Sequence, residues 1–254
     1  MVEVESITKR FGVVVAVKDA SFTLQTGELA GFLGPNGAGK STLLRMLATY
    51  LCPDAGRVRI DGLDAVQHPI EVRRRVGYLP GDNPLYHEMR TDRFLAFLAK
   101  AHGYEGEGLR ERLGWVTEAC ALQEALRKRI KECSTGFRKR IGLAGALIHD
   151  PPVLLLDEPT HGLDPLQVLA FRDLLRNLKE RRTIILSSHV VSEVAEVSDR
   201  ILIIHQGALL ADGPLAALCA REGLARPDLQ ALFAHLVGRR ASGEGARSES
   251  THAR

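Results

Sequence analysis

Hydrophobic and polar positions follow three kinds of pattern along this chain. Over the first 33 residues, apolar residues alternate with polar ones or form short β-branched runs, which is typical of strands separated by turns. The expected strands span residues 2–5, 13–17, 21–24 and 29–33. The last of these is apolar throughout, as expected of a strand buried on both faces. The pattern therefore predicts an antiparallel β layer that leads into a buried core strand.

A helical pattern occupies residues 91–149. Apolar residues at helical spacing form two faces: Phe94, Leu95, Phe97 and Leu98, then Ala119, Leu122 and Leu126. The segment is also basic, with Arg127, Lys128, Arg129, Lys131, Arg138, Lys139 and Arg140. Such a run fits either a face that docks a partner or an ordinary solvated surface.

Elsewhere strands and helices alternate. We expect strands at 57–60, 76–79, 153–156, 183–186, 200–204 and 208–210, and helices at 41–50, 69–74, 165–179, 190–197, 215–220 and 228–237. Repeated strand–helix units predict an α/β fold with a parallel core sheet. We expect one domain at 1–214 with a helical insert at about 87–150, C-terminal helices at 215–238, and a disordered, almost wholly polar tail at 239–254.

Composition adds few constraints. The 254 residues are 45% hydrophobic and 26% charged with a net charge of +3, which is too weak to indicate a nucleic-acid partner. No apolar run approaches the ~20 residues needed to span a bilayer. The chain starts without a basic and apolar leader, so we expect no signal peptide. The four cysteines form no CxxC pair, which favours reduced thiols.

The strongest chemical motif follows the strand at 29–33 and fits the P-loop pattern G-x-x-x-x-G-K-[ST] at every fixed position. Its residues are Gly34, Pro35, Asn36, Gly37, Ala38, Gly39, Lys40, Ser41 and Thr42. A triphosphate needs many backbone N–H donors, and glycines allow that close approach. Lys40 is expected on the β- and γ-phosphates, and the Ser41 hydroxyl on Mg²⁺.

Two carboxylates end the apolar strand at 153–156. Asp157 suits the shell of the Mg²⁺ held by Ser41, and Glu158 can polarise a water towards the γ-phosphate. His189 follows the strand at 183–186 at the same edge of the predicted sheet, where ligands bind in open α/β folds. Although a lone histidine is often structural, this position predicts a hydrogen bond to the γ-phosphate.

Together these motifs resemble the nucleotide-binding subunits of ATP-binding cassette (ABC) transporters, over about residues 2–213. The resemblance implies a P-loop ATPase that binds ATP and Mg²⁺. It places Phe11 against adenine, although Phe11 could instead be a core residue. Residues 133–137, Cys-Ser-Thr-Gly-Phe, lie at the family signature, so Ser134 and Gly136 are implied to contact the γ-phosphate bound by a second subunit. Ser134 also reads as a helix N-cap. Asp164 lies in the loop implied to cross the dimer interface.

Two departures from the family pattern stand out. Thr135 and Phe137 replace the usual glycine and glutamine of the signature, and Phe137 with Arg138 resembles the bacterial exporter branch that has separate membrane subunits. Gly81 stands where the family has a glutamine that contacts Mg²⁺ and the attacking water, and the neighbouring Asp82 is a weak substitute. We therefore expect hydrolysis that survives but is slow in the isolated subunit.

The resemblance implies an integral-membrane permease as partner, with the insert and the Gly81 loop as docking surface. It also implies a head-to-tail dimer, homomeric by expectation, at the cytoplasmic face of the membrane, and no nucleic-acid partner. Two alternatives stay open: a soluble ABC-type ATPase acting on ribosomes or DNA, and an ATP-gated binding module that does not hydrolyse ATP. A GTP switch is disfavoured because no Asn-Lys-x-Asp base reader is present.

Overall fold

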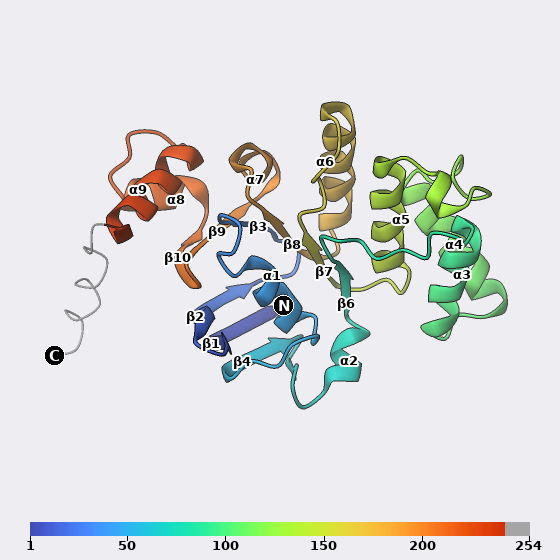
Figure 1. Cartoon of the computed structure of the whole chain (residues 1–254), viewed down its shortest axis with the longest axis horizontal. Coiled ribbons are helices and arrows are strands. Elements are labelled where there is room, and N and C mark those ends of the chain that lie inside the picture. The colour runs from blue at the N-terminus through green and yellow to red at the C-terminus, as the bar shows by residue number, and fades with distance from the viewer. Residues whose placement is uncertain (242–254) are drawn as a thin grey trace.

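The computed structural model describes residues 1–241, which form two sheets with helices packed around them (Figure 1). The smaller sheet is antiparallel with the order β2-β1-β4-β5. Its strands are β1 (Val2–Phe11), β2 (Val14–Leu24), β4 (Ala55–Ile60) and β5 (Leu63–Asp64). The separate strands expected at 13–17 and 21–24 are one strand, and that prediction was wrong. Pairing with β1 continues through a register shift, and Asp19 takes a positive φ of 48° there.

The larger sheet has the order β10-β9-β3-β8-β7-β6, and only its edge strand β10 is antiparallel. The strands are β3 (Leu29–Leu33), β6 (Val76–Leu79), β7 (Val153–Asp157), β8 (Thr183–Ser188), β9 (Arg200–His205) and β10 (Ala208–Gly213). At one edge the paired residues are Leu33 with Ser188, Asp157 with Ser187, and Leu79 with Leu156. The register therefore brings the carboxyl ends of β3, β8, β7 and β6 side by side.

Three helices connect or cover these strands close to that edge. They are α1 (Lys40–Leu47), α6 (Pro165–Lys179) and α7 (Val191–Val197). A further helix, α2 (Pro69–Arg73), lies beside the small sheet. The helix expected at 41–50 ends early, because Thr49 adopts a φ of +60° and Tyr50 N–H bonds back to the carbonyl of Arg45. In Figure 1, α1 lies between the two sheets.

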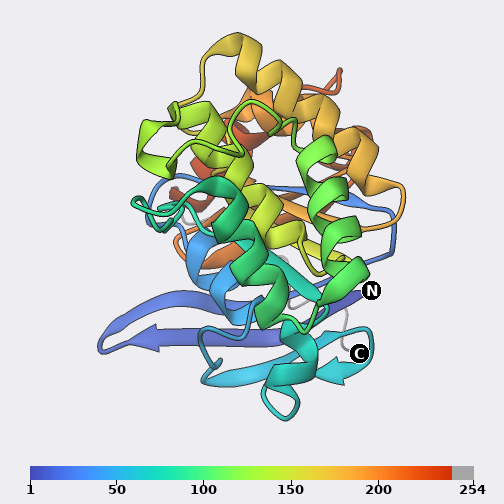
Figure 2. The same ribbon diagram turned by 90° about the vertical axis from the view of Figure 1, so that its right-hand side faces the viewer.

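The helical insert consists of α3 (Thr91–Ala101), α4 (Gly106–Ala119), the short 3₁₀ helix at Ile130–Glu132 and α5 (Thr135–Leu147). It lies to one side of the core sheet in Figure 1 and faces the viewer in Figure 2. At the other end of the sheet lie α8 (Leu215–Arg221) and α9 (Leu229–Ala241). Because α9 runs to Ala241, the expectation of disorder from residue 239 was wrong for its first three positions. Residues 242–254 lie outside the described part of the chain.

Three clusters of buried apolar side chains hold these units together. The first joins the small sheet to α1 and the underside of the core sheet. The second joins the other face of the core sheet to the insert and α6, and the third joins β9 and β10 to α8 and α9. Since burial of apolar surface is the main stabilising term, the insert is packed onto the core and not only tethered to it.

Candidate nucleotide site

Glycines allow the phosphate-binding loop to pack closely against neighbouring backbone. A Cβ on Gly34 would clash with the carbonyl oxygen of Ile204, and one on Gly39 with that of Ala16. Gly39 also has a φ of 111°, which L side chains rarely adopt. The loop is fastened at its end by Gly207 N–H, which donates to the Ala38 carbonyl at 2.9 Å. Only glycine permits this close curl at the carboxyl end of β3.

Lys40 is buried at the start of α1, with its ammonium inside the loop. Its Nζ donates to the carbonyl of Gly34 at 2.7 Å and to that of Pro35 at 3.2 Å. The same Nζ lies 3.5 Å from Oε1 of Glu158. The structure therefore brings the lysine and the glutamate, 118 positions apart in sequence, to one point at the sheet edge.

The two carboxylates at the end of β7 have different surroundings. Asp157 is buried, and its Oδ1 accepts a hydrogen bond from the Ser187 hydroxyl at 2.6 Å. Glu158 is turned away by a φ of +46°, and its N–H donates to the Ser187 carbonyl and hydroxyl oxygens. Ser187 is a positioning residue that sequence reasoning missed. The register of β7 on β8 reveals it, because Ser187 is paired with Asp157.

His189 lies against the second carboxylate, as its place after β8 predicts. Its Nδ1 is 3.0 Å from Oε2 of Glu158, a distance suited to donation from a protonated Nδ1 to the carboxylate. The ring of His161 is also near, with its centre 6.2 Å from that of His189. Lys40, Glu158 and His189 thus form one contiguous set of charged and titratable groups.

The signature residues occupy a different place. Ser134 caps α5, accepting a hydrogen bond from Phe137 N–H at 3.3 Å, so the expected N-cap is confirmed. Gly136 packs against the side chain of Gln167, and Asp164 caps α6 by accepting from Gln167 N–H at 2.9 Å. These contacts join the signature helix to α6. None of these contacts involves the phosphate-binding loop of the same chain.

Phe11 ends β1 and is 49% exposed, so the alternative that it is a core residue was wrong. The Lys9 ammonium lies 5.8 Å from the centre of its ring. The exposed aromatic face at this position is open to stacking by a planar ring.

Lys139 was read as part of a basic surface, and the structure corrects this. It is buried on α5, and its Nζ donates to the carbonyls of Gly81 at 3.1 Å and Glu158 at 3.4 Å. Burial lowers the pKa of this ammonium, against the opposing effect of Asp157 and Glu158. The lysine joins the insert to the two loops that leave β6 and β7. No sequence signal distinguishes it, since it stands within a run of other basic residues.

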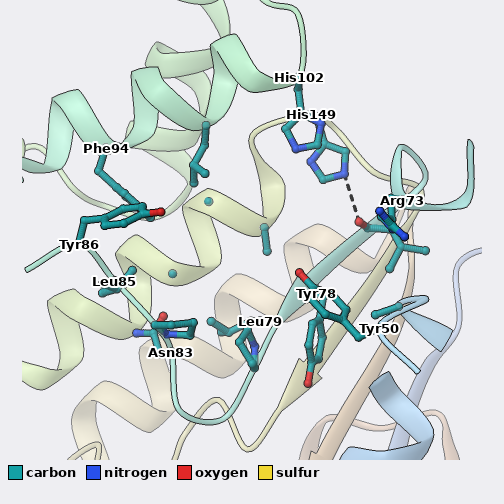
Figure 3. Close-up of a pocket in the computed structure, with 18 residues that line it drawn as sticks. Tyr50, Arg73, Tyr78, Leu79, Asn83, Leu85, Tyr86, Phe94, His102 and His149 are labelled. Carbon is teal, nitrogen blue, oxygen red and sulfur yellow. Dashed lines mark hydrogen bonds between the residues drawn. The ribbon is translucent and has the colours of Figure 1, made fainter. Parts of the chain in front are cut away.

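A pocket of about 360 Å³ lies where the core meets the insert (Figure 3). Tyr50 and Tyr78 line its core side, with ring centres 5.6 Å apart, and Tyr86 and Phe94 line its insert side at 6.0 Å. Tyr50 and Tyr86 are well exposed. The pocket therefore presents aromatic surface from both units.

Two stacked histidines close the far end of this pocket. The rings of His102 and His149 are parallel with centres 4.0 Å apart, and His149 Nε2 lies 3.2 Å from the Val76 carbonyl oxygen (Figure 3). Burial lowers the pKa of His149 to about 4 and also lowers that of His102. The His149 ring is therefore neutral at pH 7.

A family model described as ABC transporter matches residues 17–161, more than half of the chain. The chain belongs to the ABC transporter family. A second model, described as an AAA domain of a putative AbiEii toxin of type IV toxin–antitoxin systems, matches the shorter stretch 129–195. The expected ATPase subunit and its α/β P-loop fold are thereby confirmed, and the relatives described next confirm its resemblance to the exporter type.

Relatives of this ABC subunit are similar over most of its length. ABC transporter ATP-binding protein NatA of Bacillus subtilis (strain 168) is 37% identical over 228 residues, which cover 87% of this chain and 93% of NatA. Bacitracin transport ATP-binding protein BcrA of Bacillus licheniformis is 34% identical over 223 residues, covering 87% and 72%. A solved structure described as the ATP binding subunit of an ABC transporter has a TM-score of 0.85 at 27% identity and covers 93% and 99%.

ATPase dimers and membrane permease partners are typical of this family. Within residues 1–241, no helix of this ABC subunit combines the length and apolar character that crossing a bilayer requires.

Proposed function

We propose that this ABC subunit powers export of an unidentified substrate through a separate membrane permease, by closing on ATP as a dimer and reopening after hydrolysis. The observation that carries the proposal is the meeting of Lys40, Glu158 and His189 at the carboxyl edge of the core sheet. We also propose that the subunit works at the cytoplasmic face of the membrane, where ATP is available.

Each residue at this edge has a role that follows from its chemistry. The backbone N–H groups of the phosphate-binding loop and the start of α1 would bind the phosphates, with Lys40 on the β- and γ-phosphates. Glu158 would accept hydrogen bonds from the attacking water and orient it. His189 would donate a hydrogen bond from its ring N–H to the γ-phosphate. Phe11 would stack on adenine, which by analogy with base stacking contributes about 1–3 kcal/mol.

The residues present also fit Mg²⁺. Ser41 and Asp157 supply hydroxyl and carboxylate oxygens, the donors that Mg²⁺ prefers. Ser187 bonds one oxygen of Asp157 and thereby orients the carboxylate. When bound, the ion would neutralise charge on the β- and γ-phosphates. We propose Ser41 and Asp157 as its protein ligands.

A second copy would complete each nucleotide site. Ser134 and Gly136 lie at the N-terminus of α5, where unpaired N–H groups favour an anion, and Gly136 packs against Gln167 of α6. In a head-to-tail dimer they would meet the γ-phosphate bound by the other copy, with the loop before Asp164 crossing between them. Loss of that phosphate would then weaken closure.

The pocket between core and insert is our proposed permease-docking site. It joins the Gly81 loop to the insert, and its exposed aromatic rims suit an apolar segment of a partner. Docking of the partner would therefore affect the position of Lys139, whose ammonium joins the insert to the carbonyl of Glu158 on the core.

Turnover by purified wild type and Glu158→Gln tests the hydrolytic assignment. The expected loss is about 10²–10⁴-fold in kcat with ATP binding retained, since a general base contributes that much. Glu118→Gln, at an exposed carboxylate on α4, is the matched control and should keep wild-type turnover. Equal rates for wild type and Glu158→Gln would overturn the role of Glu158. Wild-type turnover as fast as roughly 10 per second would contradict the slow isolated subunit inferred from Gly81.

Co-purification tests the transport assignment. Tagged Glu158→Gln is expressed in its native cell, and membranes are solubilised in mild detergent with ATP and Mg²⁺. One multi-span protein in near-equal amount is expected, and its recovery should fall with Tyr86→Asp but not with Val13→Asp, which lies on the exposed β1–β2 turn. Recovery of ribosomal or DNA-repair proteins without an integral membrane protein would instead support a soluble ATPase role.

A further inference from the structure

Three potential metal ligands gather at the catalytic edge of the described chain. One ligand atom each from Glu158, His161 and His189 lies within 4.8 Å of the others. Glu158 and His189 belong to the proposed hydrolytic machinery, whereas His161 has no part in it. The pair of imidazoles with one carboxylate is a ligand set quite unlike the hydroxyl and carboxylate oxygens of Ser41 and Asp157.

The two histidines are held near each other by a shared anchor. Oε2 of Glu193, on α7, accepts a hydrogen bond from the Thr160 hydroxyl at 2.7 Å and another from the Ser188 hydroxyl at 2.7 Å. Thr160 directly precedes His161, and Ser188 directly precedes His189. One carboxylate therefore joins the side chains of the two residues that directly precede the histidines.

The third ligand, Glu158, is held through its backbone. Glu158 N–H is bonded to Ser187 on β8, and His161 N–H donates to the Glu158 carbonyl at 3.2 Å, closing a tight turn. Backbone hydrogen bonds thus hold Glu158 and His161, the residue before His189 is held through its side chain, and the two imidazoles stay exposed. Ligands prearranged in this way lose little freedom when they converge on an ion.

We propose that Glu158, His161 and His189 form a binding site for a transition-metal ion of the zinc class. Two imidazoles and one carboxylate are a common ligand set for Zn²⁺, with an open position for water. Ligand atoms around tetrahedral Zn²⁺ lie about 3.4 Å apart, given bonds of about 2.1 Å. The His161 ring is exposed, and a change of its rotamer would bring its nitrogen to this spacing. Mg²⁺ would not compete well, because it prefers oxygen ligands.

Occupancy of this site would stop hydrolysis, a consequence that rests on the proposed function. The ion would hold the carboxylate that is to orient water and the imidazole that is to contact the γ-phosphate. The site would thus make the ATPase sensitive to free zinc through His161, a residue outside the hydrolytic set.

Calorimetric titration of the nucleotide-free full chain with Zn²⁺ alone tests the site directly. Wild type should show one site that His161→Asn weakens by about 10–100-fold. His235→Asn is the matched control, since that histidine also lies beside a carboxylate, 3.6 Å from Glu222, but outside the cluster. It should leave this site intact. Co²⁺ added to wild type should give visible absorption typical of tetrahedral coordination, which His161→Asn should abolish.

Equal Zn²⁺ affinity in wild type and His161→Asn would overturn the site. ATPase assays at saturating ATP and Mg²⁺ then test the consequence, each variant being compared with itself without Zn²⁺. Zn²⁺ should inhibit wild type and His235→Asn, and His161→Asn should resist it by the same factor as its affinity loss. Zn²⁺ bound through His161 without inhibition would overturn the inhibitory part and the roles given to Glu158 and His189, while the binding site itself would stand.

Discussion

The phosphate-binding side of the core and the seam between the core and the insert are built in different ways. On the phosphate side, one short stretch supplies the glycines, the lysine and the start of α1, and backbone packing shapes the loop. Along the seam, Asn83 Nδ2 donates to the Arg138 carbonyl and Lys139 donates to the Gly81 carbonyl, across more than 50 positions of sequence. We propose that the first region binds the nucleotide and that the second sets the angle between α5 and the core sheet.

This difference determines how far each region can change its conformation. The phosphate loop has few alternative arrangements, because a Cβ at Gly34 or Gly39 already collides with neighbouring backbone. The seam rests on side chains that bond to carbonyls, which a small rotation of the insert would break. We therefore expect changes on the phosphate side to abolish activity and changes in the seam to reduce its efficiency.

Lys40→Met should have the largest effect. Methionine keeps the volume but removes the ammonium that lies between the loop carbonyls and Glu158. We expect ATP turnover to fall by roughly 10²–10³-fold, as for loss of one preorganised transition-state donor. Steady-state turnover and nucleotide binding measure it, and a thermal melt shows whether the fold persists. Near wild-type turnover would mean that the phosphate side does not depend on this charge.

His149→Gln probes the seam through pH. The pKa of His149 is about 4 in the fold and about 6.5 when unfolded, so the unfolded chain binds the extra proton between these values. Stability due to the neutral ring is therefore complete above pH 6.5 and is lost as pH falls towards 4. At pH 5 the loss is on the order of 1–2 kcal/mol.

Denaturant unfolding at pH 7 and pH 5 tests this. In His149→Gln the introduced amide can still donate to the Val76 carbonyl but carries no titrating ring, so the variant should lose less stability than wild type on acidification. His87→Gln, at an exposed histidine, should behave like wild type. An unchanged pH dependence in His149→Gln would show that acid sensitivity arises elsewhere.

The sequence predicted where the phosphate-loop residues lie in the fold because they are contiguous and follow directly on a buried strand. Asp157, Glu158 and His189 were found for a related reason: each ends a strand, and parallel strands end at one edge. Residues that contact the site from a neighbouring strand were harder to predict. Ser187 became visible only with the register of β7 against β8, since nothing in Leu-Ser-Ser distinguishes one serine from the other.

The seam could not be predicted because its contacts join distant residues through rotamers. Lys139 stands among seven basic residues, and periodicity does not say which one is buried. The same limit applies to helix ends: the helix expected at 41–50 stops at Leu47 because Thr49 takes a left-handed conformation, which its residue type does not announce. Local sequence pattern was thus enough to predict most helices and strands. The residues that join the core to the insert could be identified only from tertiary contacts.

Lys139→Met should have a moderate effect on turnover. It leaves the Gly81 and Glu158 carbonyls without their shared donor and loosens α5 from both loops. We expect kcat to fall about 5-fold with little change in KM, since a hydrogen bond to a charged donor contributes about 1.5–3 kcal/mol and part of it is regained by relaxation. Lys131→Met, which removes an exposed lysine paired with Glu88, is the control. A raised KM with unchanged kcat would place Lys139 in binding instead.

Ser134→Ala should have the smallest effect on the stability of the free chain. The substitution tests both regions, because Ser134 caps a helix of the insert and is proposed to contact the nucleotide bound by the second copy. Loss of the N-cap costs about 1 kcal/mol, equivalent to a fall in Tm of roughly 2–4 °C. Ser134→Asn keeps a capping oxygen and should keep the wild-type Tm. ATP-dependent dimerisation of Glu158→Gln, measured by light scattering, should weaken in both backgrounds if the serine hydroxyl contacts the γ-phosphate. Weakening with Ser134→Ala alone would show that the residue acts only through the start of α5.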